Sequence, residues 1–359
     1  MGSARTSRRG TDGTDRTSDP YAATAATLRA ALVREIVADG GLTDPAWRAA
    51  FEEVPRHLFV PHYYEAGGAG PPGGAAAYER LGRHDPDPAR RARWLAGVYA
   101  DAPLGTRVRD GELVSSSSQP SLMARMLEGL EAREGDRVLE IGTGTGYNAA
   151  LLAHRLGDDL VTTVDIDPDI TETARDHLAV AGYHPAVVTG DGALGCPSRA
   201  PFDRILATCA VTWMPPAWLA QSRPGGLILA PLATGLVALR VADAGHGQGR
   251  FLATPAYFVP LRGSESPPPV RTQGLPSRPL LDDSFRFLLN VVNARMDSLE
   301  ALALWEHEDR PERERYGVTV CEGRQWAWLD DPEGPYAWPL GPAHPAAGPG
   351  RPRPGRSGR

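Results

Sequence analysis

The sequence lacks lysine entirely, so all 38 of its Lys and Arg positions are arginines. They are outnumbered by 44 Asp and Glu residues, and the formal net charge at pH 7 is −6. A protein that binds nucleic acid needs a basic surface to neutralise the phosphates. The acidic excess therefore argues against nucleic acid as a partner, unless a local basic groove is present.

Cysteine and long apolar runs are also scarce. Cys196, Cys209 and Cys321 are too few and too scattered for a disulfide framework or a zinc site, so we expect no metal centre. No apolar stretch approaches the roughly 18 residues of a membrane span, and the polar N-terminus lacks the apolar segment of a secretory signal. The sequence therefore predicts a cytoplasmic protein that does not associate with a membrane.

The composition divides the chain into tails and a body. Residues 1–20 and 341–359 are rich in Gly, Ser, Pro, Arg and Asp, and we expect both to be disordered because they can bury little apolar surface. The body exceeds one average domain. We predict a catalytic domain over 21–263, with a helical N-terminal cap and an exposed insertion at 66–93 that is a loop with one short helix. A small C-terminal α+β domain for substrate recognition is expected over 264–340.

The central part of the chain alternates between strand-like and helix-like patterns. This alternation predicts an α/β fold with a mostly parallel, Rossmann-like sheet covered by helices. The expected strands are 137–141, 161–165, 186–189, 203–207 and 226–231, and the expected helices are 120–131, 146–156, 168–181 and 216–221. In the C-terminal part, the pattern predicts a helix over 280–304 and a short β unit over 317–338.

One strand runs directly into a glycine-rich turn. Val138–Ile141 is followed by Gly-Thr-Gly-Thr-Gly at 142–146, and a helix is expected from Tyr147. Glycines allow a sharp turn and leave room for a ligand to press against the backbone. The next strand ends at Asp165, whose carboxylate can accept both hydroxyls of a ribose. A lone glycine turn also occurs in ordinary loops, but this context favours a nucleoside-type cofactor.

Two features favour a sulfonium cofactor, S-adenosylmethionine, over a dinucleotide. Tyr147 occupies the third glycine position of the dinucleotide fingerprint, and Glu140 would repel a pyrophosphate but suits a cationic ligand. Asp191 follows a third strand, where it could bind the adenine amino group or merely shape a turn. The predicted cofactor-binding residues are Glu140, Gly142, Thr143, Gly144, Tyr147, Asp165, Ile166, Asp191 and Gly192.

Several segments together resemble the protein-L-isoaspartate O-methyltransferase family. The likeness covers about residues 25–262 and rests on the glycine turn and on Val54-Pro-Arg-His-Leu-Phe-Val-Pro61, Ser118-Gln-Pro120, Val188–Gly192, Ala200–Ile205 and Arg223–Gly226. The resemblance implies the class I fold of S-adenosylmethionine-dependent methyltransferases and a carboxyl O-methyltransferase activity. Because a carboxylate is already ionised at neutral pH, such a reaction needs no general base.

The resemblance also assigns the acceptor side of the site. It implies that Ser118 lies over the cofactor methyl group and hydrogen-bonds the substrate carboxylate. Four serines, residues 115–118, stand where the family usually has Thr-Ile-Ser, so Ser117 is a second candidate for this role. Ser116, Gln119 and Pro120 are predicted to contact the substrate. Alternatively, the serines form only a flexible loop before a capped helix.

The C-terminal part departs from compact repair enzymes. Residues 285–293 and 326–338 resemble the extension of homologues that act in the maturation of ribosomal peptides, including graspetides, lanthipeptides and lasso peptides. The second segment carries Trp326, Trp328, Tyr336 and Trp338, which could grip a peptide or form their own core.

We therefore predict methylation of an aspartate in a constrained precursor peptide, leading to a succinimide and onward to isoaspartate. The alternative is a repair enzyme for isoaspartyl and D-aspartyl residues in damaged proteins. A noncatalytic binding subunit and a small-molecule methyltransferase are further alternatives. Nothing in the sequence indicates the oligomeric state.

Overall fold

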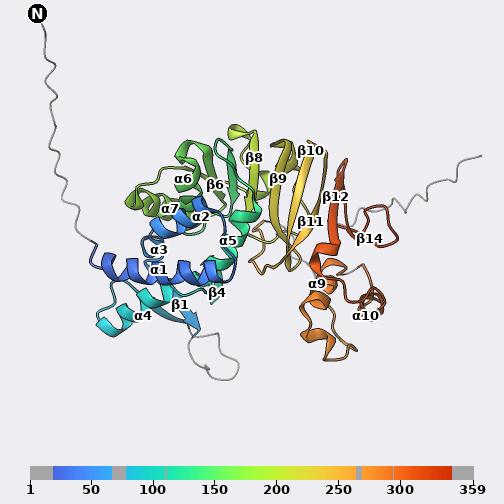
Figure 1. Ribbon diagram of the computed structural model, residues 1–359, viewed down its shortest axis with the longest axis horizontal. Coiled ribbons are helices and arrows are strands. Elements are labelled where there is room, and N and C mark those ends of the chain that lie inside the picture. The colour runs from blue at the N-terminus through green and yellow to red at the C-terminus, as the bar shows by residue number, and fades with distance from the viewer. Residues whose placement is uncertain (1–18, 67–77, 110, 264–268, 294, 342–359) are drawn as a thin grey trace, which may run out of the picture.

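The computed structural model describes residues 19–66, 78–109, 111–263, 269–293 and 295–341. Most of the two tails, the first part of the insertion and the proline-rich linker predicted after 263 lie outside these residues. The described chain is built around a ten-stranded mixed sheet, with helices packed against it (Figure 1). None of its described helices is long and apolar enough to cross a membrane.

One half of the large sheet is parallel, as the alternating pattern predicts. Its spatial order is β7-β6-β5-β8-β9. The strands are β5 (Val138–Ile141), β6 (Val161–Asp165), β7 (Ala186–Thr189), β8 (Phe202–Ala207) and β9 (Ser222–Leu232). The central strand β5 is fully buried, and the chain order reverses there, since β6 lies on one side of it and β8 on the other. Open α/β sheets bind ligands beyond the carboxyl ends of the strands at such a reversal.

The helices that precede or follow these strands begin and end at recognisable residues. They are α5 (Pro120–Gly129), α6 (Tyr147–Leu156), α7 (Pro168–Ala181) and α8 (Pro216–Ala220). Asp167 caps α7 by accepting hydrogen bonds from two backbone amides of its first turn, next to a proline at the first helical position. Gly182 ends the same helix in the left-handed conformation.

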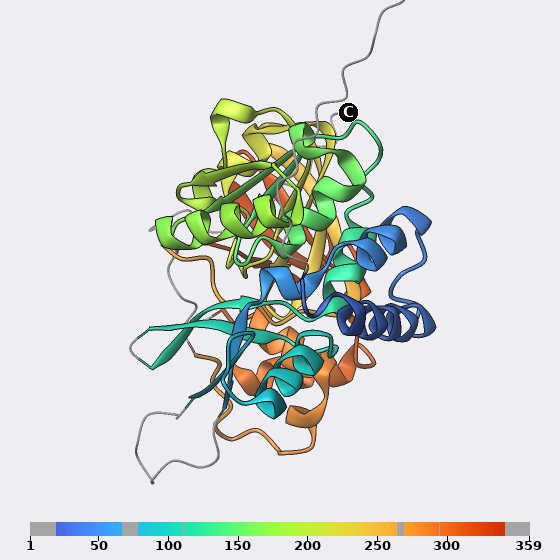
Figure 2. The same cartoon turned by 90° about the vertical axis from the view of Figure 1, so that its left-hand side faces the viewer.

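The N-terminal segment forms a helical cap, as predicted, and a second sheet. The cap consists of α1 (Ala22–Ala38), α2 (Pro45–Glu53) and α3 (Arg56–Phe59). The four-stranded sheet, drawn in cyan in Figure 2, has the order β2-β1-β3-β4. Its strands are β1 (His62–Ala66), β2 (Tyr78–Gly82), β3 (Leu104–Arg109) and β4 (Glu112–Ser117).

The described part of the insertion at 66–93 includes the start of a helix, as expected, and also a strand that the sequence analysis did not predict. In the described part of this region, β2 pairs with β1, and α4 (Pro88–Val98) begins after the cap Asp87. Arg90 on α4 forms ion pairs with Glu79 and Asp85, which ties the helix to the strand. The polar composition of this segment reflects its exposed ion pairs.

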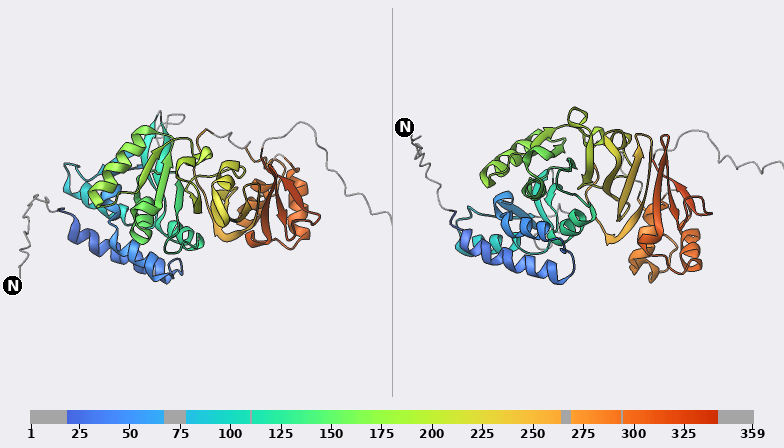
Figure 3. Two further views of the ribbon diagram at one scale, coloured as in Figure 1. Left: turned by 90° about the horizontal axis from the view of Figure 1, so that it is seen from above. Right: turned by 45° about the horizontal axis from the view of Figure 1, so that its top comes forward.

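The C-terminal elements continue the large sheet. The antiparallel strands β10 (Gly235–Asp243), β11 (His246–Pro255), β12 (Tyr316–Cys321), β13 (Arg324–Leu329) and β14 (Ala337–Pro339) extend it beyond β9. The expected helix over 280–304 is instead two helices, α9 (Asp283–Val291) and α10 (Ser298–His307), because Asp297 caps a new start. The helices α9 and α10 and the strands β12–β14 lie at the end of the molecule opposite to the N-terminal helices (Figure 3).

The C-terminal aromatic residues mainly form a core. Trp328 and Trp338 are almost completely buried. Gly317 leaves the room that Trp328 needs, since a Cβ at this glycine would lie 2.1 Å from the indole ring. The idea that these tryptophans form a peptide-gripping surface is therefore wrong for this pair, because Trp338 packs in the hydrophobic core and Trp328 is enclosed on the other face of the sheet, where the Arg250 guanidinium lies over its ring.

Candidate active site

A pocket opens at the carboxyl ends of β5, β6 and β8, where the fold predicts a ligand site. The glycine turn after β5 and the end of β6 form one wall, and the last residues of β4 form another. A third wall is the segment Val259–Arg262, which follows β11. Far-separated parts of the chain therefore surround one space. The cofactor-side lining includes Glu140, Gly142, Thr143, Gly144, Tyr147, Asn148, Asp165, Ile166 and Gly192.

The glycine turn is needed for both conformation and space. Gly142, Gly144 and Gly146 all have positive φ angles, of 100°, 52° and 85°. Residues that carry a side chain rarely adopt such angles. A Cβ at Gly142 would lie 2.5 Å from Thr208 Oγ1. A Cβ at Gly144 would lie 3.5 Å from the carbonyl oxygen of Ser116. The turn therefore brings bare backbone close to the serine segment across the pocket.

Glu140 lies at the bottom of this site and is fully buried. Asn148 Nδ2 donates to Glu140 Oε1 at 2.7 Å, and Thr163 Oγ1 donates to Glu140 Oε2 at 2.6 Å. Burial nevertheless raises the pKa of Glu140 to about 7, and the nearby charge of Asp165 adds to this effect. At neutral pH this carboxyl is therefore divided between its charged and neutral forms, and a cation in the pocket would favour the charged one.

Asn148 is a site residue that the sequence reasoning missed. Its Nδ2 is used by Glu140, whereas its buried Oδ1 has no hydrogen-bond partner within the part of the chain that the structure describes. A buried acceptor without a partner is unfavourable unless a ligand or water satisfies it. This oxygen is therefore placed to accept a hydrogen bond from a ligand. Its position in the first turn after the glycines is the signal that could have identified it.

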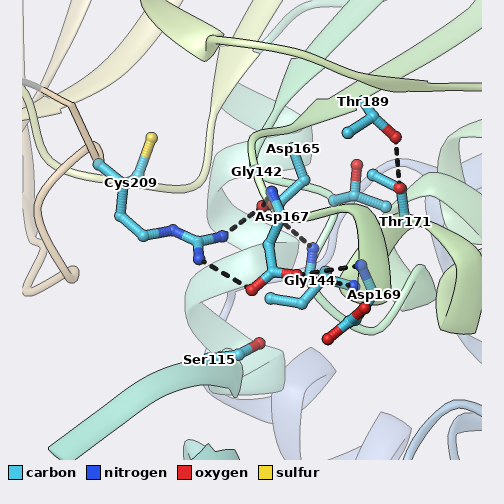
Figure 4. Close-up of polar contacts among 12 residues, drawn as sticks. Ser115, Gly142, Gly144, Asp165, Asp167, Asp169, Thr171, Thr189 and Cys209 are labelled. Carbon is cyan, nitrogen blue, oxygen red and sulfur yellow. Dashed lines mark hydrogen bonds and ion pairs between the residues drawn. The ribbon is translucent and has the colours of Figure 1, made fainter. Parts of the chain in front are cut away.

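Asp165, which lines the pocket, and the nearby Asp167 are bridged by a guanidinium (Figure 4). That group belongs to Arg262, which contacts Asp165 and lies 3.5 Å from Asp167 Oδ2. Arg109 also pairs with Asp167, at 3.2 Å. Burial raises the pKa of Asp167, but the backbone amides of Ile170 and Asp169 and the guanidinium groups of Arg107 and Arg109 hold it below its usual value. Local sequence carries no sign of Arg262, because it is 97 residues from Asp165.

The four serines line the acceptor side of the pocket. Ser115 Oγ accepts from Thr106, and Ser117 Oγ accepts from Arg56. Among the described residues, the Ser116 and Ser118 hydroxyls have no such partner, so they are the two hydroxyls available to a ligand. Residues two apart point to the same side of a strand, which is why the serines alternate in this way. The first three serines belong to β4, so the alternative of a flexible loop is wrong for them.

Arg56 supports this segment from below. Its guanidinium is completely buried and donates to the carbonyl oxygens of Ser118 at 3.0 Å and Val98 at 2.8 Å. Burial lowers its pKa to about 10, so it stays charged at neutral pH. It also lies 5.9 Å from the centre of the Tyr147 ring. Arg56 thus links the serine segment to the start of α6.

Three predicted site residues lie outside the pocket lining. Asp191 accepts a hydrogen bond from the backbone amide of Ala193 and begins a short 3-10 turn, which is the turn-shaping alternative considered for it. Gln119 donates to Asp101, and Pro120 is buried at the first position of α5. In the described part of the chain, no cluster of three or more His, Cys, Asp or Glu side chains could hold a metal ion.

Comparisons with known proteins agree with this geometry. Residues 90–266 match the family model of protein-L-isoaspartate(D-aspartate) O-methyltransferase. Protein-L-isoaspartate O-methyltransferase 1 of Anaeromyxobacter sp. (strain Fw109-5) is 37% identical over 235 residues, which cover 64% of this chain and 93% of that protein. The enzyme of Ignicoccus hospitalis is 33% identical over 235 residues, which cover 64% of this chain and 95% of its own length.

The fold is shared with solved structures. A protein-L-isoaspartate O-methyltransferase structure aligns with a TM-score of 0.55 and 22% identity, covering 87% of this chain and 98% of its own. The predicted α/β class I methyltransferase fold is therefore confirmed. The sequence matches also confirm the predicted enzyme class, a carboxyl O-methyltransferase that depends on S-adenosylmethionine. On this evidence, the chain belongs to the protein-L-isoaspartate O-methyltransferase family.

Proposed function

We propose that this chain methylates the free α-carboxylate of an L-isoaspartyl residue in a peptide or protein, with S-adenosylmethionine as the methyl donor. One observation carries the proposal: a single pocket joins the glycine turn and Asp165 on one side to free serine hydroxyls on the other. The names of the related proteins support isoaspartate as the acceptor. This acceptor was the alternative in the sequence analysis, and the comparisons favour it.

The side chains around the pocket fit the cofactor. The unpaired acceptor Asn148 Oδ1 suits the ammonium group of its methionine part, and the Asp165 carboxylate suits the two ribose hydroxyls. The charged form of Glu140 favours a cation in this space. When bound, the cofactor would supply a methyl group on a sulfonium centre: a carboxylate oxygen can form a bond to this methyl carbon while the carbon–sulfur bond breaks and S-adenosylhomocysteine leaves.

The protein contributes placement to this reaction. We infer that the Ser118 hydroxyl donates to the oxygen of the acceptor carboxylate that does not react, and that Ser116 or Ser117 contributes to the same wall. Arg56 holds the carbonyl groups of this segment in place. Aligning acceptor oxygen, methyl carbon and sulfur in a space that excludes water accounts for the acceleration. No side chain has to remove a proton, because the acceptor is already a carboxylate.

A second candidate acceptor is an aspartate in a constrained ribosomal precursor peptide. The family match ends at residue 266, whereas α9, α10 and the strands β12–β14 continue beyond it. Additional structure joined to the catalytic sheet favours recognition of a larger or more specific substrate. In this case the next backbone nitrogen attacks the methyl ester, methanol leaves, and the resulting succinimide hydrolyses to isoaspartate or aspartate.

The two candidates differ in the substrate they require, so matched peptides separate them. The protein is incubated with S-adenosylmethionine and three peptides of one sequence: linear with L-isoaspartate, linear with L-aspartate, and macrocyclic with L-aspartate. We expect mass spectrometry to detect the gain of a methyl group on the isoaspartyl peptide first. Modification of the macrocyclic peptide alone would favour the second candidate, and methylation of none of the three would contradict both.

Ser118→Ala tests the acceptor side of the pocket. We expect the rate of methyl transfer to fall by about 10- to 100-fold, since one hydrogen bond to a charged group is lost. Affinity for S-adenosylhomocysteine should stay within twofold of the starting protein, about the error of the measurement. Ser121→Ala is the matched control, because Ser121 lies outside the pocket lining. Equal rates for both variants would exclude a role for the Ser118 hydroxyl.

A further inference from the structure

The hydrogen-bonding capacity of Asp165 is already largely in use within the protein. Oδ1 accepts from the backbone amide of Asp167 at 3.2 Å and from the Arg262 guanidinium. Oδ2 accepts from the backbone amide of Gly144 at 3.3 Å. Each carboxylate oxygen has about two acceptor sites. Within the described residues, these contacts leave one free site, on Oδ2, whereas the two hydroxyls of a ribose need two.

Of the three donors, Arg262 is the one that can leave. The amides of Gly144 and Asp167 belong to the backbone of the glycine turn and of the helix cap, which the fold holds in place. The Arg262 side chain is partly exposed and already lies 3.5 Å from a second carboxylate oxygen, Asp167 Oδ2. It can therefore give up Asp165 and remain paired with an anion.

We propose that Arg262 competes with the ribose hydroxyls of the cofactor for the Asp165 carboxylate and moves onto Asp167 when the ribose binds. This inference rests on the proposed function, since it takes Asp165 as the ribose acceptor. The motion is confined to the side chain. The backbone just before Arg262 is fixed by two hydrogen bonds with Ala210. Ala210 N donates to Val259 O at 2.9 Å, and Leu261 N donates to Ala210 O at 2.8 Å.

The competition has a consequence for turnover. The demethylated product keeps the ribose and its hydroxyls, so Arg262 competes with product as well as with cofactor. A side chain that returns to Asp165 weakens product binding and speeds its release. Arg262 is thus a positioning residue that sets affinity through Asp165, while the methyl transfer itself proceeds at the other end of the cofactor.

The test is direct binding of S-adenosylhomocysteine, measured by isothermal titration calorimetry on the full chain. Arg262→Gln removes the competitor, and we expect the affinity to increase by about two- to fivefold, because a partly exposed ion pair contributes little more than this. Arg262→Lys retains a cation and should bind close to the starting protein. Arg240→Gln is the matched control, since Arg240 pairs with Glu131 at the surface and both residues lie outside the pocket lining. Its affinity should change by less than about twofold.

A second ligand isolates the hydroxyl groups. The 2′,3′-dideoxy analogue of S-adenosylhomocysteine cannot donate to Asp165, so Arg262→Gln should leave its affinity unchanged. Weaker binding of S-adenosylhomocysteine to Arg262→Gln, or an equal gain for both ligands, would overturn the competition. Failure of the starting protein to bind S-adenosylhomocysteine at all would instead contradict the proposed function.

Discussion

Glu140 is a carboxyl held in the interior by two neutral partners, Asn148 and Thr163. Burial of an ionisable group is unfavourable in its charged form. Its raised pKa of about 7 means that the folded chain keeps a proton that the unfolded chain releases near its ordinary value of 4.5. A buried carboxyl with a shifted pKa is typical of functional sites.

Glu140→Gln tests this state through stability. A carboxyl with a raised pKa makes the folded state bind more protons, so the free energy of unfolding falls as pH rises from 4.5 to 7. The total loss is about 3 kcal/mol, from the shift in pKa. We expect urea unfolding to show that Glu140→Gln loses much less stability than the starting protein between acidic and mildly alkaline pH.

The matched control for this experiment is Glu172→Gln, on the exposed side of α7. This variant should retain the pH dependence of the starting protein. If Glu140→Gln shows the same slope as the control, the Glu140 carboxyl is not protonated in the folded chain at neutral pH. At mildly alkaline pH, we expect Glu140→Gln to be more stable than the starting protein and to bind the cationic cofactor with lower affinity.

At the scale of elements, the acceptor side of the site depends on how α3 is joined to α4 and to the serine segment at the end of β4. The Arg56 guanidinium at the start of α3 donates to two backbone carbonyl oxygens, one at the end of α4, Val98, and one in the serine segment, Ser118. The Val-Pro-Arg-His-Leu-Phe motif is therefore more than a family signature, since its arginine supports the wall that faces the substrate.

Arg56→Met should lower the free energy of unfolding by about 2–4 kcal/mol, because buried carbonyl oxygens lose their donors. The rate of methyl transfer should also fall, while affinity for S-adenosylhomocysteine changes less, since Arg56 is outside the pocket lining. Urea unfolding and calorimetric binding measure the two effects. Arg48→Met, at an exposed ion pair on α2, is the control and should change stability little. A comparable effect of both substitutions would contradict the role of Arg56.

At the scale of the whole molecule, the C-terminal elements and the catalytic sheet share one hydrophobic core. Phe287 on α9 packs against Phe251 on β11, with ring centres 4.9 Å apart, and against Tyr316 on β12, at 5.2 Å. The ladder between β11 and β12 also crosses the boundary predicted at residue 263. We therefore expect the C-terminal elements and the cofactor site to unfold together.

Phe287→Ala should destabilise the protein by about 3–5 kcal/mol, as for other large core side chains. Tryptophan fluorescence and binding of S-adenosylhomocysteine should be lost in a single urea transition, moved to lower urea. Leu281→Ala is the control, because Leu281 is 80% exposed and its loss leaves no cavity. Two separate transitions, the first of which leaves binding intact, would contradict a shared core.

The sequence by itself determined the parts of this protein that depend on short stretches of chain. The strand, glycine turn and helix around Gly142–Gly146 and the carboxylate that ends β6 follow from hydrophobic spacing and local backbone requirements. The role of the serines before α5 is implied by the family resemblance. The family resemblance reached the enzyme class from the same segments. Local patterns could not decide between a turn-shaping and a ligand-binding role for Asp191, because both kinds of aspartate follow a strand in the same way.

Only the tertiary structure decided which distant residues meet. It brought Arg262 to Asp165, placed Arg56 under the serines, left Asn148 Oδ1 without a partner and joined the C-terminal strands to the catalytic sheet. Such contacts depend on how separate elements pack, and a side chain's sequence neighbours carry no record of its partner across the fold. The cofactor half of the site is therefore readable from local sequence, whereas the groups that tune it became visible only in the folded chain.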